Sequence, residues 1–133
     1  MQQPTNPQFP LAGKKWEILR LAGVRFFVQP GFLLFMGIFF ALLLENSSDM
    51  VFAGLVCFIA FFSLMAHEAG HALAARAFGL GPVRVTLVMF GGHTQHPPTT
   101  RGRALLITLA GPLANLLICI ALLAALVARV PLG

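Results

Sequence analysis

Residues 50 to 77 read MVFAGLVCFIAFFSLMAHEAGHALAARA, and this stretch determines how the chain can fold. The part from Met50 to Ala66 is apolar and uncharged, and the helical composition continues to Ala77, before Gly79 and Gly81-Pro82. Glycine and proline at that point indicate the end of a helix. Because about 20 helical residues cross the hydrocarbon core of a bilayer, we predict a membrane-spanning helix over about residues 50–78.

The composition of the whole chain also indicates a membrane protein. Of its 133 residues, 58% are hydrophobic and only 10% are charged, and the mean hydropathy is +0.86. A typical globular domain has about 25% charged residues. So few charged side chains cannot cover the surface of a water-soluble domain. The composition therefore excludes a soluble globular domain and a disordered chain, and the length favours one domain.

Two further apolar runs flank the first one. One extends over residues 26–44, interrupted only by Gln29-Pro30, and the other covers residues 104–128 without a charge. Each is long enough to cross a bilayer. Between the second and third spans, the β-branched residues of 83–88 precede a Gly-Gly and a Pro-Pro pair, which favours a β-hairpin or a re-entrant loop. The predicted fold class is an all-α membrane protein with three transmembrane helices and this short hairpin or loop.

The basic residues indicate the topology. Cytoplasmic ends of membrane spans carry an excess of Lys and Arg. Here these residues cluster before the first span and between the second and third: Lys14, Lys15, Arg20, Arg25, Arg76, Arg84, Arg101 and Arg103. We therefore predict a cytoplasmic N-terminus and a cytoplasmic loop over about residues 78–103. Residues 1–23 are predicted to form a cytoplasmic tail, with an interfacial helix around Trp16 to Leu21, and residues 24–133 the membrane core.

The net charge of +5 does not predict a nucleic-acid partner. Basic residues beside apolar runs are ordinary topology signals, and the chain lacks basic residues interleaved with aromatic ones on an exposed face. Cys57 and Cys119 lie inside apolar runs without metal-type spacing, so we interpret both as small core residues.

A chemically distinctive motif lies near the end of the second span, in Ala66-His67-Glu68-Ala69-Gly70-His71. His67 and His71 are four residues apart, so on a helix they share a face and can bind one metal ion. Zinc suits two imidazoles and one further protein ligand, with a water in the fourth position. Glu68 projects beside the pair, where a carboxylate can accept a proton from that water. The alternative is a helix end at which these side chains only meet water and headgroups.

This motif resembles that of the site-2 protease family of intramembrane zinc metalloproteases. The resemblance continues in Phe90-Gly91-Gly92 and in Leu109-Ala110-Gly111-Pro112-Leu113-Ala114-Asn115-Leu116, and it covers about residues 24–128. It implies a zinc-dependent endopeptidase that cuts transmembrane or membrane-proximal segments of membrane-protein substrates in regulated proteolysis. It further implies that His67 and His71 are Zn²⁺ ligands and that Glu68 is the catalytic base.

The third metal ligand is the point at which the chain departs from the family pattern. The family supplies an Asp from a later helix, whereas the single Asp here, Asp49, lies about 27 Å from His67 along a helix. Three explanations stay open. The chain is a partial family member without the completing helix, or His93 or His96 is the third ligand. Otherwise the chain binds metal weakly and is an inactive binding or regulatory membrane subunit.

Other residues are candidates for substrate contact or for helix packing. These are Gly91, Gly92 and Asn115, and for Asn115 a hydrogen bond between helices is favoured. Two readings stay open for the strand near Val83 to Val88: an extended substrate pairs with it as an exposed strand, or the strand pair only closes the cytoplasmic face. Because three helices bury little against one another, self-association or a regulatory membrane partner is also expected. A metal transporter or sensor that uses His67, His71 and His93 is a weaker alternative, since no span offers a polar path.

Overall fold

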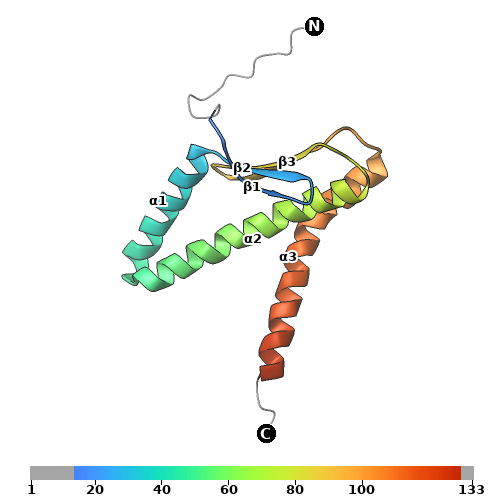
Figure 1. Cartoon of the computed structure of the whole chain (residues 1–133). Helices are drawn as coiled ribbons and strands as arrows, with labels where there is room; N and C mark the ends of the chain where they lie inside the picture. Colours follow the sequence, from blue (N-terminus) through green and yellow to red (C-terminus); the bar gives the residue numbers. More distant parts are fainter. Residues whose placement is uncertain (1–13, 130–133) are drawn as a thin grey trace.

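A computed structural model describes residues 14–129 of the chain. Its elements alternate between a small sheet and three long helices (Figure 1). In chain order they are β1 (Trp16–Leu21), β2 (Val24–Val28), α1 (Pro30–Ser47), α2 (Met50–Ala77), β3 (Val83–Val88), β4 (Gly91–Gln95) and α3 (Arg101–Arg129).

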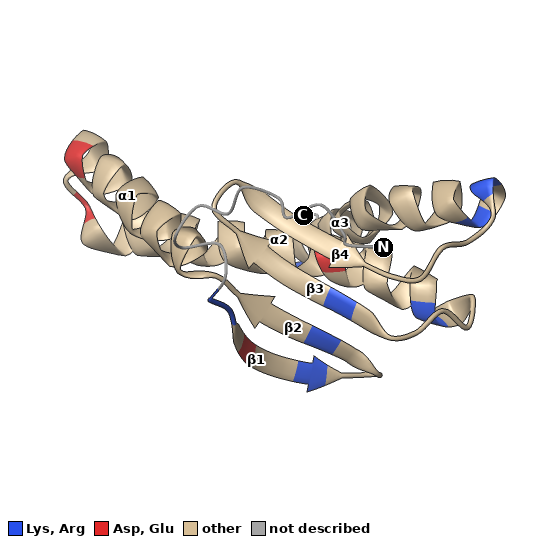
Figure 2. Cartoon of the chain, turned by 90° about the horizontal axis from the view of Figure 1, so that it is seen from above, with Lys and Arg blue, Asp and Glu red and all other residues tan. Residues whose placement is uncertain are grey.

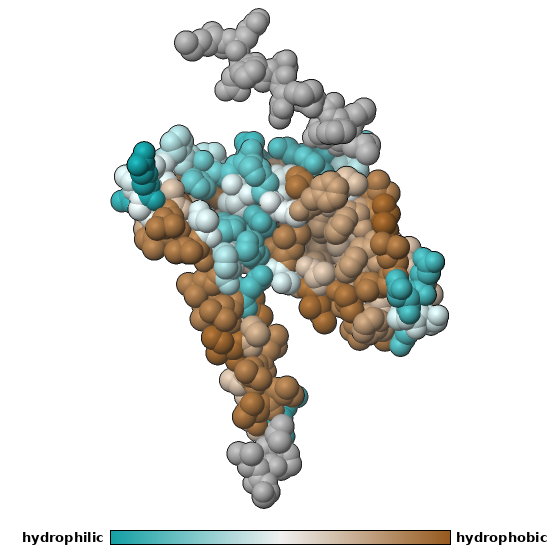
Figure 3. Space-filling model, turned by 180° about the vertical axis from the view of Figure 1, so that it is seen from behind, coloured by the Kyte–Doolittle hydropathy of each residue, from teal (hydrophilic) through white to brown (hydrophobic). Residues whose placement is uncertain are grey.

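All three predicted spans are helices that are long and apolar enough to cross a membrane. α2 begins where the Asp49 carboxylate accepts hydrogen bonds from the backbone N–H groups of Val51 and Phe52, an ordinary N-cap. α1 starts at Pro30 and not at residue 26, because proline suits the first turn of a helix. Figure 3 shows the apolar surface along the helices and the polar surface at the end that carries the sheet.

A four-stranded sheet with the order β1-β2-β3-β4 corrects the predicted all-α fold class. The predicted hairpin is present as the antiparallel pair β3–β4. β2 pairs in parallel with β3, so residues 26–28, which were assigned to the first span, belong to a strand in the middle of the sheet. The strand predicted to receive a substrate, Val83–Val88, is paired on both sides, and the expectation of an open edge there is wrong.

β1 replaces the interfacial helix predicted around Trp16 to Leu21. It pairs antiparallel with β2, and the register shifts between Glu17 and Leu19, which leaves Ile18 in a β-bulge. A two-residue turn follows, in which Ala22 and Gly23 both have positive φ, as the favoured hairpin turn requires. The remainder of the predicted tail, residues 1–13, lies outside the described residues.

The inner face of the sheet packs on the second half of α2. Val24, Phe26, Val83 and Val85 from β2 and β3 are buried together with Ala72 and Ala75 of α2 and Ile107 of α3. Alanines on α2 let the helix approach the sheet closely. On the other side of α2, Gly70 lies against α3, where an added Cβ would be 2.5 Å from the Ala110 carbonyl oxygen. The second half of α2 is therefore held between the sheet and α3.

Candidate metal centre

Two imidazoles and a carboxylate meet in the part of α2 that lies between β4 and α3. The ligand atoms of His67, Glu68 and His71 all lie within 4.8 Å of one another. The two imidazole rings have centroids 4.8 Å apart and are inclined by 85°. The structure thus brings together the three residues that the sequence motif singled out.

α3 fixes the orientation of one imidazole. Nδ1 of His71 lies 2.7 Å from the backbone carbonyl oxygen of Ile107. A carbonyl oxygen only accepts hydrogen bonds, so Nδ1 must carry the proton and donate it. Nε2 of His71 then keeps its lone pair, and histidine ligands of metal ions are commonly held by such a bond from the other ring nitrogen.

Gly111 of α3 leaves space beside both rings. A Cβ at this position would collide with Nε2 of His71 and would lie 2.9 Å from Nε2 of His67. Both Nε2 atoms therefore border the same small space next to the α3 backbone. Two nitrogen donors that converge on one space, one of them with its tautomer fixed, are a donor set that suits zinc.

Glu68 is held by β4. It is only 5% exposed, and the hydroxyl of Thr94 donates a hydrogen bond of 2.6 Å to its Oε2. Gly92 lies against the same carboxylate, since an added Cβ there would be 2.5 Å from Oε1. Alternate residues of a strand share a face, so β4 presents Gly92 and Thr94 together to Glu68.

A polar cavity of about 260 Å³ adjoins this carboxylate. Its lining includes Glu68, His71, His93 and His96. Nδ1 of His96 lies 2.8 Å from the Pro97 carbonyl oxygen, which leaves its Nε2 as the acceptor nitrogen. The cluster within 4.8 Å contains neither His93 nor His96. Their role as a third ligand stays a prediction.

Of the predicted contact residues, Gly92 lines this cavity, whereas Gly91 and Asn115 lie apart from it. Gly91 lines a separate apolar cavity of about 300 Å³ between α1, α2 and the β3–β4 turn. Asn115 lies at the α2–α3 crossing, where its Nδ2 is 3.4 Å from the hydroxyl oxygen of Ser63. This is the hydrogen bond between helices that was favoured from the sequence.

Three groups of the site were not identified from the sequence. The Ile107 carbonyl and the space at Gly111 depend on how α3 crosses α2, and no local pattern reports that crossing. Thr94 had a usable signal, because it follows Gly92 by two residues and so faces the same way in a strand.

The comparisons with known proteins agree with this geometry. No family model matches the chain. Zinc metalloprotease MJ0392 of Methanocaldococcus jannaschii is 27% identical over 107 residues, which are 80% of this chain and 31% of that protein. A second curated relative, sll0528 of Synechocystis sp., is 27% identical over 113 residues, 77% of this chain and 30% of its own length. The chain thus spans about a third of the length of these relatives.

A solved structure shows the fold. The site-2 protease from Methanocaldococcus jannaschii matches 84% of this chain and 51% of its own, with a TM-score of 0.68 and 24% sequence identity. The resemblance to site-2 proteases that the motifs predicted is therefore confirmed: the chain has their fold and is related to zinc metalloproteases.

Proposed function

We propose that this chain forms the zinc-binding core of an endopeptidase that hydrolyses peptide bonds within or beside the membrane-spanning segments of other membrane proteins. The observation that carries the proposal is the position of Glu68. Its carboxylate is buried and hydrogen-bonded next to two imidazoles whose Nε2 atoms border one space. A buried acid so close to two metal-type donors is a usual arrangement for hydrolysis.

The donor set fits a zinc ion held by His67 and His71. When bound, zinc lowers the pKa of a water molecule toward neutral and polarises a peptide carbonyl. The orientation of His71 is supplied by the Ile107 carbonyl, and Gly111 keeps the space beside both rings free of side-chain atoms. The third protein ligand is proposed to be His93 or His96, or a residue from another segment.

Glu68 acts as the general base. It takes a proton from the attacking water and passes it to the amide nitrogen of the leaving peptide. The Thr94 hydroxyl holds Oε2, which leaves Oε1 to carry the proton. Gly92 lets β4 approach closely enough for this hydrogen bond to form, because a side chain at this position would occupy the place of the carboxylate.

A substrate helix must unwind before it is cut, since its carbonyls are otherwise hydrogen-bonded within the helix. Among residues 14–129, β4 pairs only with β3, so it is an edge strand that offers unpaired backbone groups. An extended substrate segment that pairs with β4 would lie alongside Gly92 and Thr94, and hence beside Glu68. We place this end of the molecule on the cytoplasmic side, where most of the basic residues lie.

A Glu68→Gln variant tests this function. The chain, reconstituted in vesicles with a single-span reporter protein, is expected to cleave the reporter, with the products identified by mass spectrometry. Glu68→Gln should keep its zinc and lose cleavage by about 10²–10⁴-fold, the usual contribution of a general base. Glu45→Gln is the matched control, because Glu45 is an exposed carboxylate near the C-terminal end of α1 and is not part of the site.

The outcomes separate the two functions under consideration. Full cleavage by Glu68→Gln would overturn the role of Glu68 as the base. Wild-type chain that takes up no zinc and cleaves no reporter would favour the alternative, a binding or regulatory membrane subunit. The specific observation behind that alternative is that the described residues supply a cluster with only two imidazoles.

A further inference from the structure

β1 has two chemically different faces because of its bulge. Simple alternation along Trp16-Glu17-Ile18-Leu19-Arg20-Leu21 would place Trp16 and Arg20 on one face. With Ile18 in the bulge, Trp16, Leu19 and Leu21 instead stand opposite Val28, Phe26 and Val24, three of the four buried residues of β2. Residues directly opposite each other in an antiparallel pair point to the same face. The three apolar side chains of β1 therefore face the side on which the helices lie.

None of the three described helices packs extensively against this apolar face. α2 packs against β4, β3 and, less extensively, β2, while β1 makes its extensive contacts with β2 alone. Trp16 and Leu19 are each 44% exposed, and Leu21 is 63% exposed. In Figure 2 β1 is the edge of the sheet farthest from α3, with α2 lying beneath the other strands. Trp16, Leu19 and Leu21 thus form a row of large, exposed apolar side chains on the face of the sheet that is elsewhere covered by helices.

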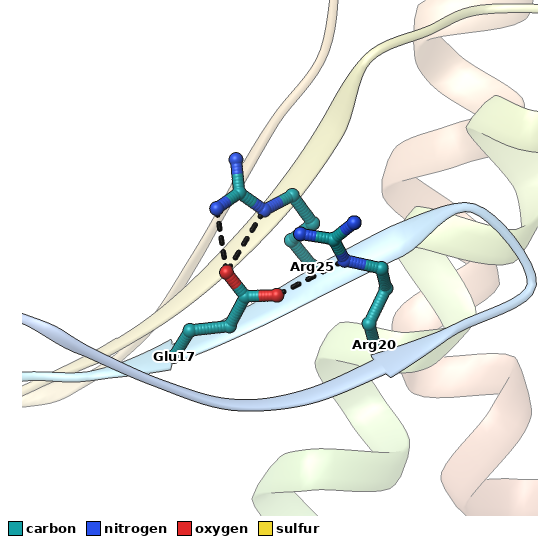
Figure 4. Close-up of polar contacts among 3 residues, drawn as sticks. All are labelled: Glu17, Arg20 and Arg25. Carbon is teal, nitrogen blue, oxygen red and sulfur yellow. Dashed lines mark hydrogen bonds and ion pairs between the residues drawn. The ribbon is translucent and has the colours of Figure 1, made fainter.

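The opposite face of the β1–β2 hairpin is cationic. Glu17 and Arg20 stand opposite Phe27 and Arg25, and the Glu17 carboxylate binds both arginines (Figure 4). Lys15 and Arg25 lie over the Phe27 ring, at 4.9 and 5.1 Å from its centroid. With Lys14, this hairpin has four cationic side chains and one carboxylate, so it keeps a net positive charge.

We propose that β1 lies in the headgroup layer of an anionic phospholipid bilayer, with Trp16, Leu19 and Leu21 directed toward the acyl chains. β2 is followed by Gln29 and then by α1, so the hairpin is at the level where the first membrane-spanning helix begins. Tryptophan is enriched at this level of the membrane. Anionic lipid fits because an amphipathic segment with cations binds by apolar burial together with attraction to negative headgroups.

Trp16 is the only tryptophan of the chain, which also lacks tyrosine, so its fluorescence reports β1 directly. The full chain is reconstituted in phosphatidylcholine vesicles, with or without phosphatidylglycerol, that contain lipids brominated near the headgroup end or near the methyl end of the acyl chain. We expect blue-shifted emission, stronger quenching by the shallow bromine than by the deep one, and weak quenching by aqueous acrylamide. Phosphatidylglycerol should increase the bromine quenching.

Two variants test the two faces separately. Leu21→Asn should reduce the bromine quenching, and because Leu21 is exposed this change removes no core contact. Lys15→Gln should weaken the effect of phosphatidylglycerol. Arg129→Gln removes one positive charge at the C-terminal end of α3 and is the matched control. It should leave the effect of phosphatidylglycerol unchanged.

Three results would overturn the proposal. The first is Trp16 that is quenched by acrylamide and not by bromine, which would place β1 in water. The second is blue-shifted Trp16 that neither agent quenches, which would indicate that a second copy or another protein segment covers the strand. The third is bromine quenching that phosphatidylglycerol leaves unchanged, which would contradict the anionic surface. None of these outcomes depends on zinc or on peptide cleavage, so the proposal stands or falls apart from the proposed function.

Discussion

The two edge strands of the sheet, β4 and β1, differ in what lies against them. β4 packs against α2, and its Gly92 and Thr94 contact a buried carboxylate. β1 has no extensive contact with any helix in the described part of the chain, and its Trp16, Leu19 and Leu21 are exposed. The strands are of similar length and belong to one sheet, so the cover supplied by α2 makes the difference. The covered edge holds the Glu68 carboxylate, which we propose as the general base, and the uncovered edge is the one that we propose meets the lipid surface.

Gly92→Ala should break the covered edge and have the largest effect. The new Cβ would occupy the place of the Glu68 side chain, which must then move. A displacement of about 1 Å in a catalytic group can cost about 10²-fold in rate, so we expect a loss of reporter cleavage of at least that order. Gly102→Ala is the control, because nothing lies within 4 Å of a Cβ there. Unchanged cleavage in Gly92→Ala would contradict the contact between β4 and Glu68.

Gly70→Ala should weaken the support of the covered edge without touching the carboxylate. Its Cβ would lie 2.5 Å from the Ala110 carbonyl oxygen and 2.9 Å from the Ala114 side chain, so α2 and α3 must separate. Such overpacking costs about 1–3 kcal/mol, measurable as a lower denaturation midpoint in detergent. Gly54→Ala, also in α2 but with nothing within 4 Å, should be neutral or stabilising. Equal effects of the two changes would argue against the close α2–α3 crossing.

Loss of the Glu17 ion pairs at the uncovered edge should produce the smallest effect. Hydrogen bonds from Arg25 and Arg20 lower the pKa of Glu17 from 4.5 to about 2, and Glu17 raises the pKa of Arg25. Since the folded-state pKa is depressed, the ion pairs contribute stability above about pH 4.5, and this contribution is lost as the pH falls toward about 2. The gain is small because the groups are exposed.

Trp16 emission checks this prediction, since Trp16 is next to Glu17 on β1. The wild-type chain should show a small change in emission between about pH 4.5 and 2, and Glu17→Gln should show none in this window. An identical change in both proteins would assign the effect to another group.

The helices could be predicted from the sequence because each is a single long apolar run. The pairing of His67 with His71 could be predicted because residues four apart share one face of a helix. β1 could not be predicted from the sequence, since its bulge at Ile18 breaks the alternation of apolar and polar residues that identifies a strand. Its apolar residues then follow neither a strand nor a helix period. The first span was placed too early for a related reason: residues 26–28 are as apolar as a helix, but they form a central strand that is buried.

Within the site, the sequence predicted the residues carried by one helix and also Gly92, His93 and His96 as candidates, but it missed other groups that come from β4 and α3. His67, Glu68 and His71 all belong to one five-residue stretch of α2. The Ile107 carbonyl and Gly111 come from α3, and Thr94 comes from β4. Their contribution depends on how these elements pack, which the order of residues along the chain does not reveal.

The central claim is that His67 and His71 hold a zinc ion beside Glu68. X-ray absorption spectroscopy on the zinc-loaded chain tests it most directly. The account predicts stoichiometric zinc with two imidazole nitrogens at about 2.0–2.1 Å, with this environment lost in His71→Ala and kept in Glu68→Gln. An absence of bound zinc, or a zinc environment that His71→Ala leaves unchanged, would contradict it.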